Sequence, residues 1–225
     1  MMSARLLSKS APSNAVDLSG YLALYNWEPP SPTVSKVPVY ADIHPSNVVD
    51  GISTVNPKWG TQCYGGYAPN GSFITYFQKE GNIYNLETTG EYTVDLWWRF
   101  EAASGAYNPI IIGNNTSVVN LTFSFASDYL RWSVGSQIKT ISPMPFLATG
   151  QWHHLALCSH TAGSRLNCYI NGVYQGVLVT NLDTYVKNRL FLTGGSYSYV
   201  DEVRVRDTAI WPDYSNIAVP TEPVL

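Results

Sequence analysis

The acidic residues are the first candidates for chemistry, because retaining hydrolysis of a glycosidic bond needs two carboxyl groups about 5 Å apart. Asp95 is the only acidic residue of the segment YTVDLWWRF at 92–100. Asp201 and Glu202 are adjacent, so in a regular strand their side chains point to opposite faces. Neither arrangement predicts a pair of catalytic carboxylates.

Nucleophilic and zinc-assisted hydrolysis are not predicted either. The chain has no Gly-x-Ser-x-Gly motif. His154 and Cys158 stand four residues apart in one expected strand, too far for a hydrogen bond, and the neighbours His153 and His154 face opposite ways. No Cys and His spacing is typical of a zinc site. We therefore expect the protein not to be an enzyme.

The composition favours a sheet protein without a nucleic acid partner. Hydrophobic residues make up 45% and charged residues only 13%, about half the usual charged share. The 16 Tyr and 7 Trp suit pleated, half-buried surfaces and supply large contact areas with a polar tip. A formal net charge of −3 offers no basic surface for phosphates. The sequence shows neither a span long enough for a membrane nor a secretory signal, so we expect no membrane partner.

From about residue 40 onward, the chain reads as short strands separated by turns. In the segment 92–100, alternate residues point to opposite faces. Asn171-Gly172 is the strongest hairpin signal. The irregular alternation near Asp201 and Glu202 predicts a bulge or a strand end there, and we expect these two residues to bond a neighbouring loop. The spacing predicts an all-β sandwich over 41–225. The expected strands are 92–100, 110–113, 117–125, 129–134, 152–159, 166–170, 173–179, 189–194 and 199–207.

Residues 1–40 differ from the rest and are expected to form an extended arm. They are rich in Ser, Pro and Ala, with EPPSPTVSKVP at 28–38, and clustered prolines favour extended backbone. Such arms lie on a partner's surface through aromatic and apolar anchors. The expected anchors are Leu18, Tyr21, Leu22, Leu24, Tyr25 and Trp27.

Two of the three cysteines are placed symmetrically about Gly163. If 153–159 and 166–171 form a hairpin, Cys158 and Cys168 face each other across it. A disulfide and two buried thiols are both open at this point, with buried thiols favoured because free Cys packs as a small apolar residue.

Five passages follow one another in a recognisable order: EYTVDLWWRF at 91, GQWHHLALCSH at 150, LNCYINGVYQG at 166, FLTGGSYSYVDEVRVRDTAIW at 191 and PDYSNIAVPTEPVL at 212. With a looser match of KWGTQCYGG at 58, the stretch from about 58 to 220 resembles the laminin-G-like, concanavalin A-like jelly-roll domains, most of all those of phage and bacterial surface proteins. The resemblance implies a two-sheet antiparallel jelly-roll sandwich behind the N-terminal arm. These domains include glycosidases with an E-x-D-x-x-E strand, and this chain lacks that pattern.

Carbohydrate binding is the activity that this resemblance implies. Asp95, Trp97 and Arg99 share one face of their strand and offer an aromatic platform with hydrogen-bonding neighbours. Trp97 also matches a tryptophan that is usual in the family, which favours a structural role for it. Tyr107, Tyr197 and Tyr199 are alternative aromatic contacts.

Calcium is the one cofactor that the resemblance leaves open, because many relatives bind it at the sandwich rim. Calcium takes carboxylate, amide and carbonyl oxygens on flexible loops, although no DxDxD cluster is present. The candidates by loop position are Asn114, Asn115, Asp128 and Asp183.

Three functions are consistent with these observations. The leading hypothesis is a non-catalytic virion protein, a phage capsid-decoration or tail-appendage subunit that is made in the host cytoplasm and displays the sandwich on the virion surface. Its arm would bind other virion proteins, and the protein would form homo-oligomers or attach to a repeating lattice. The displayed sandwich would bind cell-surface glycans. The alternatives are a stand-alone lectin or adhesin and a degenerate glycosidase.

Overall fold

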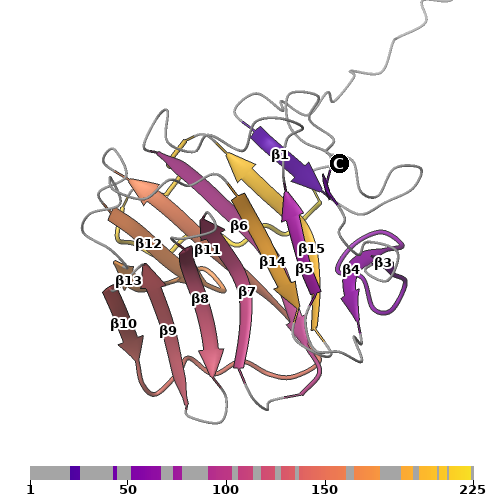
Figure 1. Cartoon of the computed structure of the whole chain (residues 1–225), viewed down its shortest axis with the longest axis horizontal. Helices are drawn as coiled ribbons and strands as arrows, with labels where there is room; N and C mark the ends of the chain where they lie inside the picture. The colour runs from indigo at the N-terminus through magenta and orange to yellow at the C-terminus, as the bar shows by residue number, and fades with distance from the viewer. Residues whose placement is uncertain are drawn as a thin grey trace, which may run out of the picture.

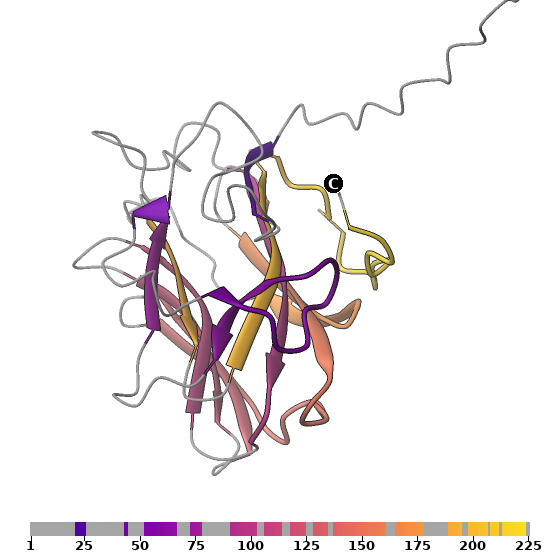
Figure 2. The ribbon, with the colours of Figure 1, turned by 90° about the vertical axis from the view of Figure 1, so that its right-hand side faces the viewer.

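Two antiparallel sheets face each other in the computed structural model (Figures 1 and 2). No helix, and so no helix able to cross a membrane, occurs among the described residues. The resemblance to a jelly-roll sandwich is confirmed. The structure describes residues 21–25, 43–44, 52–66, 73–77, 91–102, 106–113, 118–124, 128–134, 137–160, 165–177, 189–194, 198–206, 208–211 and 213–223.

We call the two sheets A and B. Sheet A runs in the order β13-β12-β11-β6-β15-β4-β3, with β1 also paired to β15, and sheet B runs β10-β9-β8-β7-β14-β5-β2. The strands of sheet A are β1 (Tyr21–Tyr25), β3 (Ile52–Ser53), β4 (Cys63–Gly66), β6 (Tyr92–Phe100), β11 (Trp152–His160), β12 (Arg165–Ile170), β13 (Val173–Val177) and β15 (Ser198–Arg206). Those of sheet B are β2 (Ile43–His44), β5 (Phe73–Phe77), β7 (Ala106–Gly113), β8 (Val118–Ser124), β9 (Tyr129–Val134), β10 (Gln137–Ile141) and β14 (Arg189–Gly194).

The core lies between the sheets, where alternate residues of β6 meet β7. The Trp98 ring stacks on Phe100 at 4.7 Å between ring centroids, and Tyr107 of sheet B meets Trp98 edge-on at 5.8 Å. Each fully buried side chain of this size contributes about 1.5–3 kcal/mol through removal of apolar surface from water. Tyr107, an expected sugar contact, therefore lies in the core, where its hydroxyl donates to the Ala102 carbonyl.

The face of sheet A that points away from sheet B, here called the outer face, is also covered. β6 and β11 are buried on both faces over most of their length. The covering pieces are residues 54–62, here called the cover loop, and residues 208–211 and 213–219, here called the C-terminal strap. In Figure 2 the strap, coloured yellow, lies on the side of sheet A opposite to sheet B.

The bulge predicted in β15 is confirmed. The pairing of β15 with β6 shifts register between Asp201 and Arg204, and Glu202 has a φ of 48°. On the edge of β15 that faces away from β6, the residues before the bulge pair with β4. The residues after the bulge pair with β1. The bulge thus lies where β15 changes its partner, and there Asp201 bonds the cover loop as expected.

Residues 21–25 do not behave as part of a separate arm. They form β1, which pairs antiparallel with Val203–Arg206 of β15, and Leu24 is fully buried. The expected boundary at residue 40 therefore does not hold for this segment, which belongs to the sandwich. The side chains of Tyr21, Leu22 and Tyr25, and the whole of Leu18 and Trp27, lie outside the described residues.

The hairpin between β11 and β12 differs from the expected register by one residue. Cys158 pairs with Asn167, and Leu157 pairs with Cys168, so the two thiols point to opposite faces of sheet A. No disulfide joins the cysteines, all of which lie in described segments. The expectation that Cys158 faces Cys168 is wrong, whereas the two buried thiols are confirmed.

The turn at Asn171-Gly172 is confirmed and seats the C-terminal strap. Asn171 and Gly172 have φ values of 49° and 80°. A Cβ atom at Gly172 would lie 2.6 Å from the Ile217 carbonyl oxygen, and the Ile217 amide donates to the Gly172 carbonyl over 2.8 Å. Glycine is therefore required here by conformation and by space.

Candidate functional site

A buried polar cluster occupies the outer face where the sugar platform was expected. Asp95 of β6 accepts hydrogen bonds from His154 Nε2 of β11, at 3.0 Å, and from Arg204 of β15. All three side chains are buried. Burial acts to raise the pKa of Asp95, but the Arg204 charge and the His154 hydrogen bond outweigh it and hold that pKa below its usual value. The cluster ties three neighbouring strands together.

Trp97 lies beneath the cover loop. The Trp59 ring meets Trp97 edge-on at 5.4 Å, and Lys58 Nζ lies 3.9 Å from the centroid of the Trp97 ring. Asp201 Oδ2 holds this loop by accepting from the Lys58 and Trp59 amides at 2.9 and 3.3 Å. With 6% of its surface exposed, Trp97 is not an open platform for a sugar ring.

At the end of the same face, the partly exposed side chains of Arg99 and Trp152 lie beside Tyr199, which is buried with 8% of its surface exposed. We call these three residues the Arg99 row. Arg99 of β6 pairs with Trp152 of β11 on one side and with Tyr199 of β15 on the other. Directly paired residues project from the same face, so three consecutive strands present Tyr, Arg and Trp side by side. The structure thus brings together Arg99 and Tyr199, two of the six expected ligand contacts.

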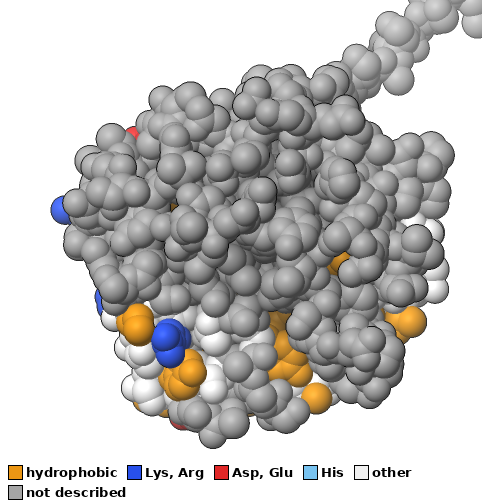
Figure 3. Space-filling model, in the orientation of Figure 1, with side chains coloured by type: hydrophobic (Ala, Val, Ile, Leu, Met, Phe, Trp, Pro, Cys, Tyr) orange, Lys and Arg blue, Asp and Glu red, His pale blue; other side chains and the backbone are white. Residues whose placement is uncertain are grey.

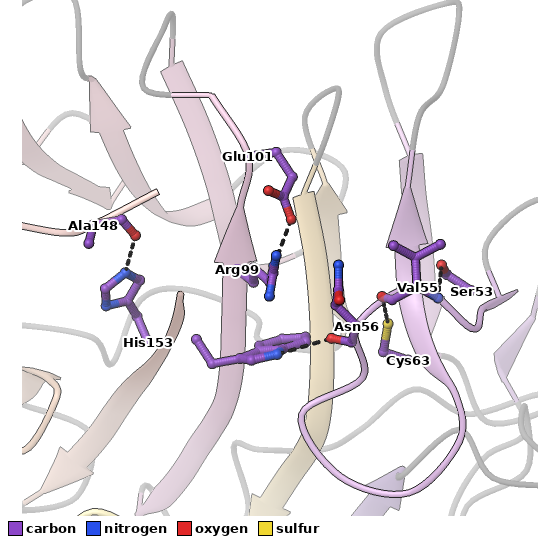
Figure 4. A network of polar contacts seen from close by, with 9 residues as sticks. Ser53, Val55, Asn56, Cys63, Arg99, Glu101, Ala148 and His153 are labelled. Carbon is purple, nitrogen blue, oxygen red and sulfur yellow. Dashed lines mark hydrogen bonds and ion pairs between the residues drawn. The ribbon is translucent and has the colours of Figure 1, made fainter. Parts of the chain in front are cut away.

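Hydrogen bonds hold two side chains of the Arg99 row, those of Arg99 and Trp152, and Figure 4 draws both bonds. Arg99 Nε donates to Glu101 Oε1 over 2.6 Å, with exposed side-chain fractions of 16% and 32%. Trp152 Nε1 donates to the Asn56 carbonyl of the cover loop over 3.1 Å. Burial and the Glu101 carboxylate raise the pKa of Tyr199, so its phenol stays protonated. The row offers an ion pair and a partly exposed indole in set positions.

Residues 148–151, which precede β11, lie beside the Arg99 row. Gly150 donates its amide to the Phe100 carbonyl over 2.8 Å. His153 Nε2 lies 2.9 Å from the Ala148 carbonyl oxygen (Figure 4). A Cβ atom on Gly150 would stand 3.7 Å from Glu101 Oε2 and 3.8 Å from Arg99 Nη2. The backbone at Gly150 therefore forms one side of the site.

The expected calcium site stays a prediction, because three of its four candidate residues lie outside the described ranges. Asp128 is exposed, and its Oδ1 accepts from the Met144 amide over 3.2 Å. Within the described ranges, no group of three or more His, Cys, Asp or Glu side chains could hold a metal ion. Asn114, Asn115, Asp183 and the expected sugar contact Tyr197 lie outside those ranges.

Sequence reasoning missed Trp152 and Glu101. The alternation along WHHLALCSH already places Trp152 on the face of His154. Its neighbour Arg99 depends on the register between β11 and β6, which single-strand patterns do not give. Glu101 stands two residues after Arg99, the spacing of same-face neighbours on a strand, and this signal was available.

A sequence profile of the concanavalin A-like lectin/glucanases superfamily matches residues 75–213, which is more than half of the chain. The chain belongs to this superfamily. The lectin-like jelly-roll assignment drawn from the five sequence passages is thereby confirmed. No curated protein sequence matches this superfamily member significantly.

Solved structures share the fold at low sequence identity. The binding domain of botulinum neurotoxin serotype D has a TM-score of 0.63 and 12% identity over 87% of this chain and 49% of its own. Domain 4 of an extracellular arabinanase from Geobacillus stearothermophilus, in complex with arabinotriose, has a TM-score of 0.61 and 18% identity over 85% and 94%. Trypanosoma rangeli sialidase has a TM-score of 0.59 and 11% identity over 87% of this chain and 32% of its own. This superfamily member spans about half the length of the neurotoxin binding domains that it matches.

Proposed function

We propose that this protein is a non-catalytic glycan-binding domain whose binding surface is the Arg99 row. The observation that carries the proposal is the fixed alignment of Tyr199, Arg99 and Trp152 on three adjacent strands. An indole packs on the apolar face of a sugar ring, while a guanidinium and a carboxylate hydrogen-bond its hydroxyl groups. The superfamily includes lectins by name, and the matched arabinanase domain was solved with arabinotriose.

The described carboxylates support binding without catalysis. Asp95 is buried and held by Arg204 and His154, and Glu101 is paired with Arg99. Burial raises the pKa of Asp201 to about 7, a value that would suit a general acid. However, Asp201 is itself buried, and its two oxygens accept from three backbone amides. These described carboxylates therefore serve packing or ion pairing, and they form no acid and nucleophile pair facing solvent.

The setting that we propose for this domain is a virion surface, as part of a capsid-decoration or tail-appendage subunit. Support comes from the resemblance of the sequence passages to phage copies and from the Pro-rich N-terminal residues. Residues before Tyr21 would bind other virion proteins, and the sandwich would display the Arg99 row. Calcium at a rim loop stays an optional part of this proposal.

Affinity electrophoresis of the whole chain tests the binding function. Native gels would contain linear arabinan, laminarin, xylan or polygalacturonate, each with calcium or with a chelator. We expect at least one polysaccharide to retard the chain, and the same mixtures to release no reducing sugar over hours. Unchanged mobility in every gel would contradict glycan binding, whereas release of reducing sugar would favour the degenerate glycosidase.

A further inference from the structure

A second aromatic and arginine cluster lies on the outer face, at the edge formed by β12 and β13. The Tyr174 and Tyr214 rings stand 5.7 Å apart with planes tilted by 58°. The Arg165 guanidinium lies 5.9 Å from the centroid of the Tyr214 ring, and its Nη1 donates to the Tyr214 hydroxyl. Tyr214 keeps 47% of its surface exposed. We call this group the Tyr214 cluster.

The backbone that carries the Tyr214 cluster is held firmly. The Tyr169 hydroxyl lies 3.0 Å from the Trp211 carbonyl oxygen and 2.7 Å from that of Asp213. The Tyr174 amide donates to Asn216 Oδ1 over 3.0 Å. Together with the contact at Gly172, these bonds bracket Tyr214 on both sides. A ligand would therefore meet aromatic rings that are already in position, which lowers the entropy cost of binding.

The need to anchor the strap does not by itself explain why an aromatic side chain stands at position 214. The rings that hold the strap to sheet A are Tyr169 and Trp211, and Tyr169 is fully buried. Tyr214 is instead half-exposed, and its hydroxyl accepts from the exposed Arg165 side chain. The Arg165 guanidinium uses Nη1 to donate to the Tyr214 hydroxyl. A guanidinium carries five N–H donors, so one hydrogen bond does not use its full donor capacity.

The Tyr214 cluster and the Arg99 row lie on the same face of sheet A. Arg165 pairs with His160 of β11, and Tyr174 pairs with Tyr169, which pairs with Ala156. Ala156 and His160 share the face of Trp152 because they are separated from it by even numbers of residues. At about 3.4 Å per residue, the eight steps from Trp152 to His160 span roughly 27 Å.

We propose that the Tyr214 cluster is a second glycan-binding site and that the ligand of this domain is a polysaccharide that occupies both sites at once. This inference rests on the proposed function of the Arg99 row. Two sites on one rigid face convert the second contact of a repeating polymer into an intramolecular step, which raises avidity without strengthening either site. A short oligosaccharide fills only one site at a time and gains nothing from the other.

Calorimetry on the whole chain tests this proposal with four variants. The probes are whichever of arabinan, laminarin, xylan or polygalacturonate retards the wild-type chain most, and the trisaccharide of that polymer. The variants are Tyr214→Ala, Trp152→Ala, the double variant, and Ile138→Ala as the matched control. Ile138 is 56% exposed on β10 of sheet B, and in Figure 3 hydrophobic and basic side chains reach the surface over this part of sheet B. Thermal unfolding of each variant shows whether it folds.

The expected result is two trisaccharides per wild-type chain and one per single variant. Tyr214→Ala should lower the apparent affinity for the polymer at least about tenfold, and Ile138→Ala should change nothing. If Tyr214→Ala binds like wild type while Trp152→Ala loses binding, the second site is refuted and the proposed function stands. If Trp152→Ala binds like wild type, or the wild-type chain binds no polysaccharide, the proposed function fails.

Discussion

Asp95 and His154 lie on neighbouring strands with Oδ2 3.0 Å from Nε2, and both side chains are buried beneath the outer face of sheet A. This face carries charged and aromatic groups, as a lectin platform would. The cover loop and the C-terminal strap close over its centre, where Trp211 meets His154 edge-on at 6.1 Å. Among the described residues, the two ends of the face, at Arg99 and at Tyr214, each keep an arginine and an aromatic side chain at least partly exposed.

Replacing Asp95 should destabilise the sandwich strongly. Asp95→Ala leaves Arg204 buried without its carboxylate, so we expect a loss of about 3–5 kcal/mol in the free energy of unfolding by urea. The matched control is Glu101→Ala, which breaks a partly exposed ion pair and should cost less than about 1 kcal/mol. Equal losses in the two variants would contradict a structural role for the buried cluster.

The Asp95 carboxyl should also account for part of the loss of folding stability at acid pH. Because its folded-state pKa is lowered, its contribution to stability is present above the unfolded pKa of about 4. That contribution is lost as the pH falls through the lower, folded-state value. Asp95→Asn should therefore show a flatter decline of stability in acid than wild type, measured by urea unfolding between pH 2 and pH 5.

Asp201 should give the opposite dependence on pH. Its pKa is raised to about 7, against about 3.9 in the unfolded chain. Between these values the folded state keeps a proton that the unfolded state has released, so the stability that depends on this group falls as the pH rises through 7. Asp201→Asn should remove this decline in urea unfolding at pH 5, 6, 7 and 8. A decline of the same size in the variant would assign it to other groups.

The cysteines should behave as protected thiols. Burial raises the pKa of Cys158 and of Cys168, so neither forms the reactive thiolate near neutral pH. We expect Ellman's reagent to react with them only after unfolding, and a reducing agent to leave the melting temperature unchanged. A drop in melting temperature on reduction would show a bond that the register between β11 and β12 does not allow.

Two N-terminal deletions should separate folding from assembly. Removal of residues 1–20 leaves β1 in place and should not change the unfolding free energy. Removal of residues 1–26 takes away β1 and the buried Leu24, and a buried leucine alone is worth about 2–5 kcal/mol. If residues before Tyr21 bind other virion proteins, the shorter deletion yields a stable sandwich that no longer joins its assembly. Equal stability of the two truncated chains would mean that β1 adds nothing to the sheet.

Local patterns predicted the strands and turns well, and for physical reasons. Alternation along 92–100 and 152–159 marks two of the three nine-residue strands of sheet A, and Asn-Gly tolerates the positive φ of the turn at 171–172. The bulge near Asp201 followed from apolar residues that cannot share one face. Each of these signals is contained within one short segment.

The site depended on relationships between segments, which alternation does not encode. A shift of one residue between β11 and β12 placed Cys158 and Cys168 on opposite faces. Asp95 and Trp97 looked available because the cover loop and the strap, both without regular structure, gave no sign of folding over them. The Arg99 row likewise needed the register of three strands.

Glycan binding by the Arg99 row can be measured as the dissociation constant of the polysaccharide that retards the wild-type chain, for Arg99→Ala, Trp152→Ala and the Ile138→Ala control. We expect both row variants to keep their fold and to bind at least about tenfold more weakly, equivalent to about 1.4 kcal/mol. The control should bind like wild type. Folded row variants that bind as tightly as the control would contradict glycan binding by the Arg99 row.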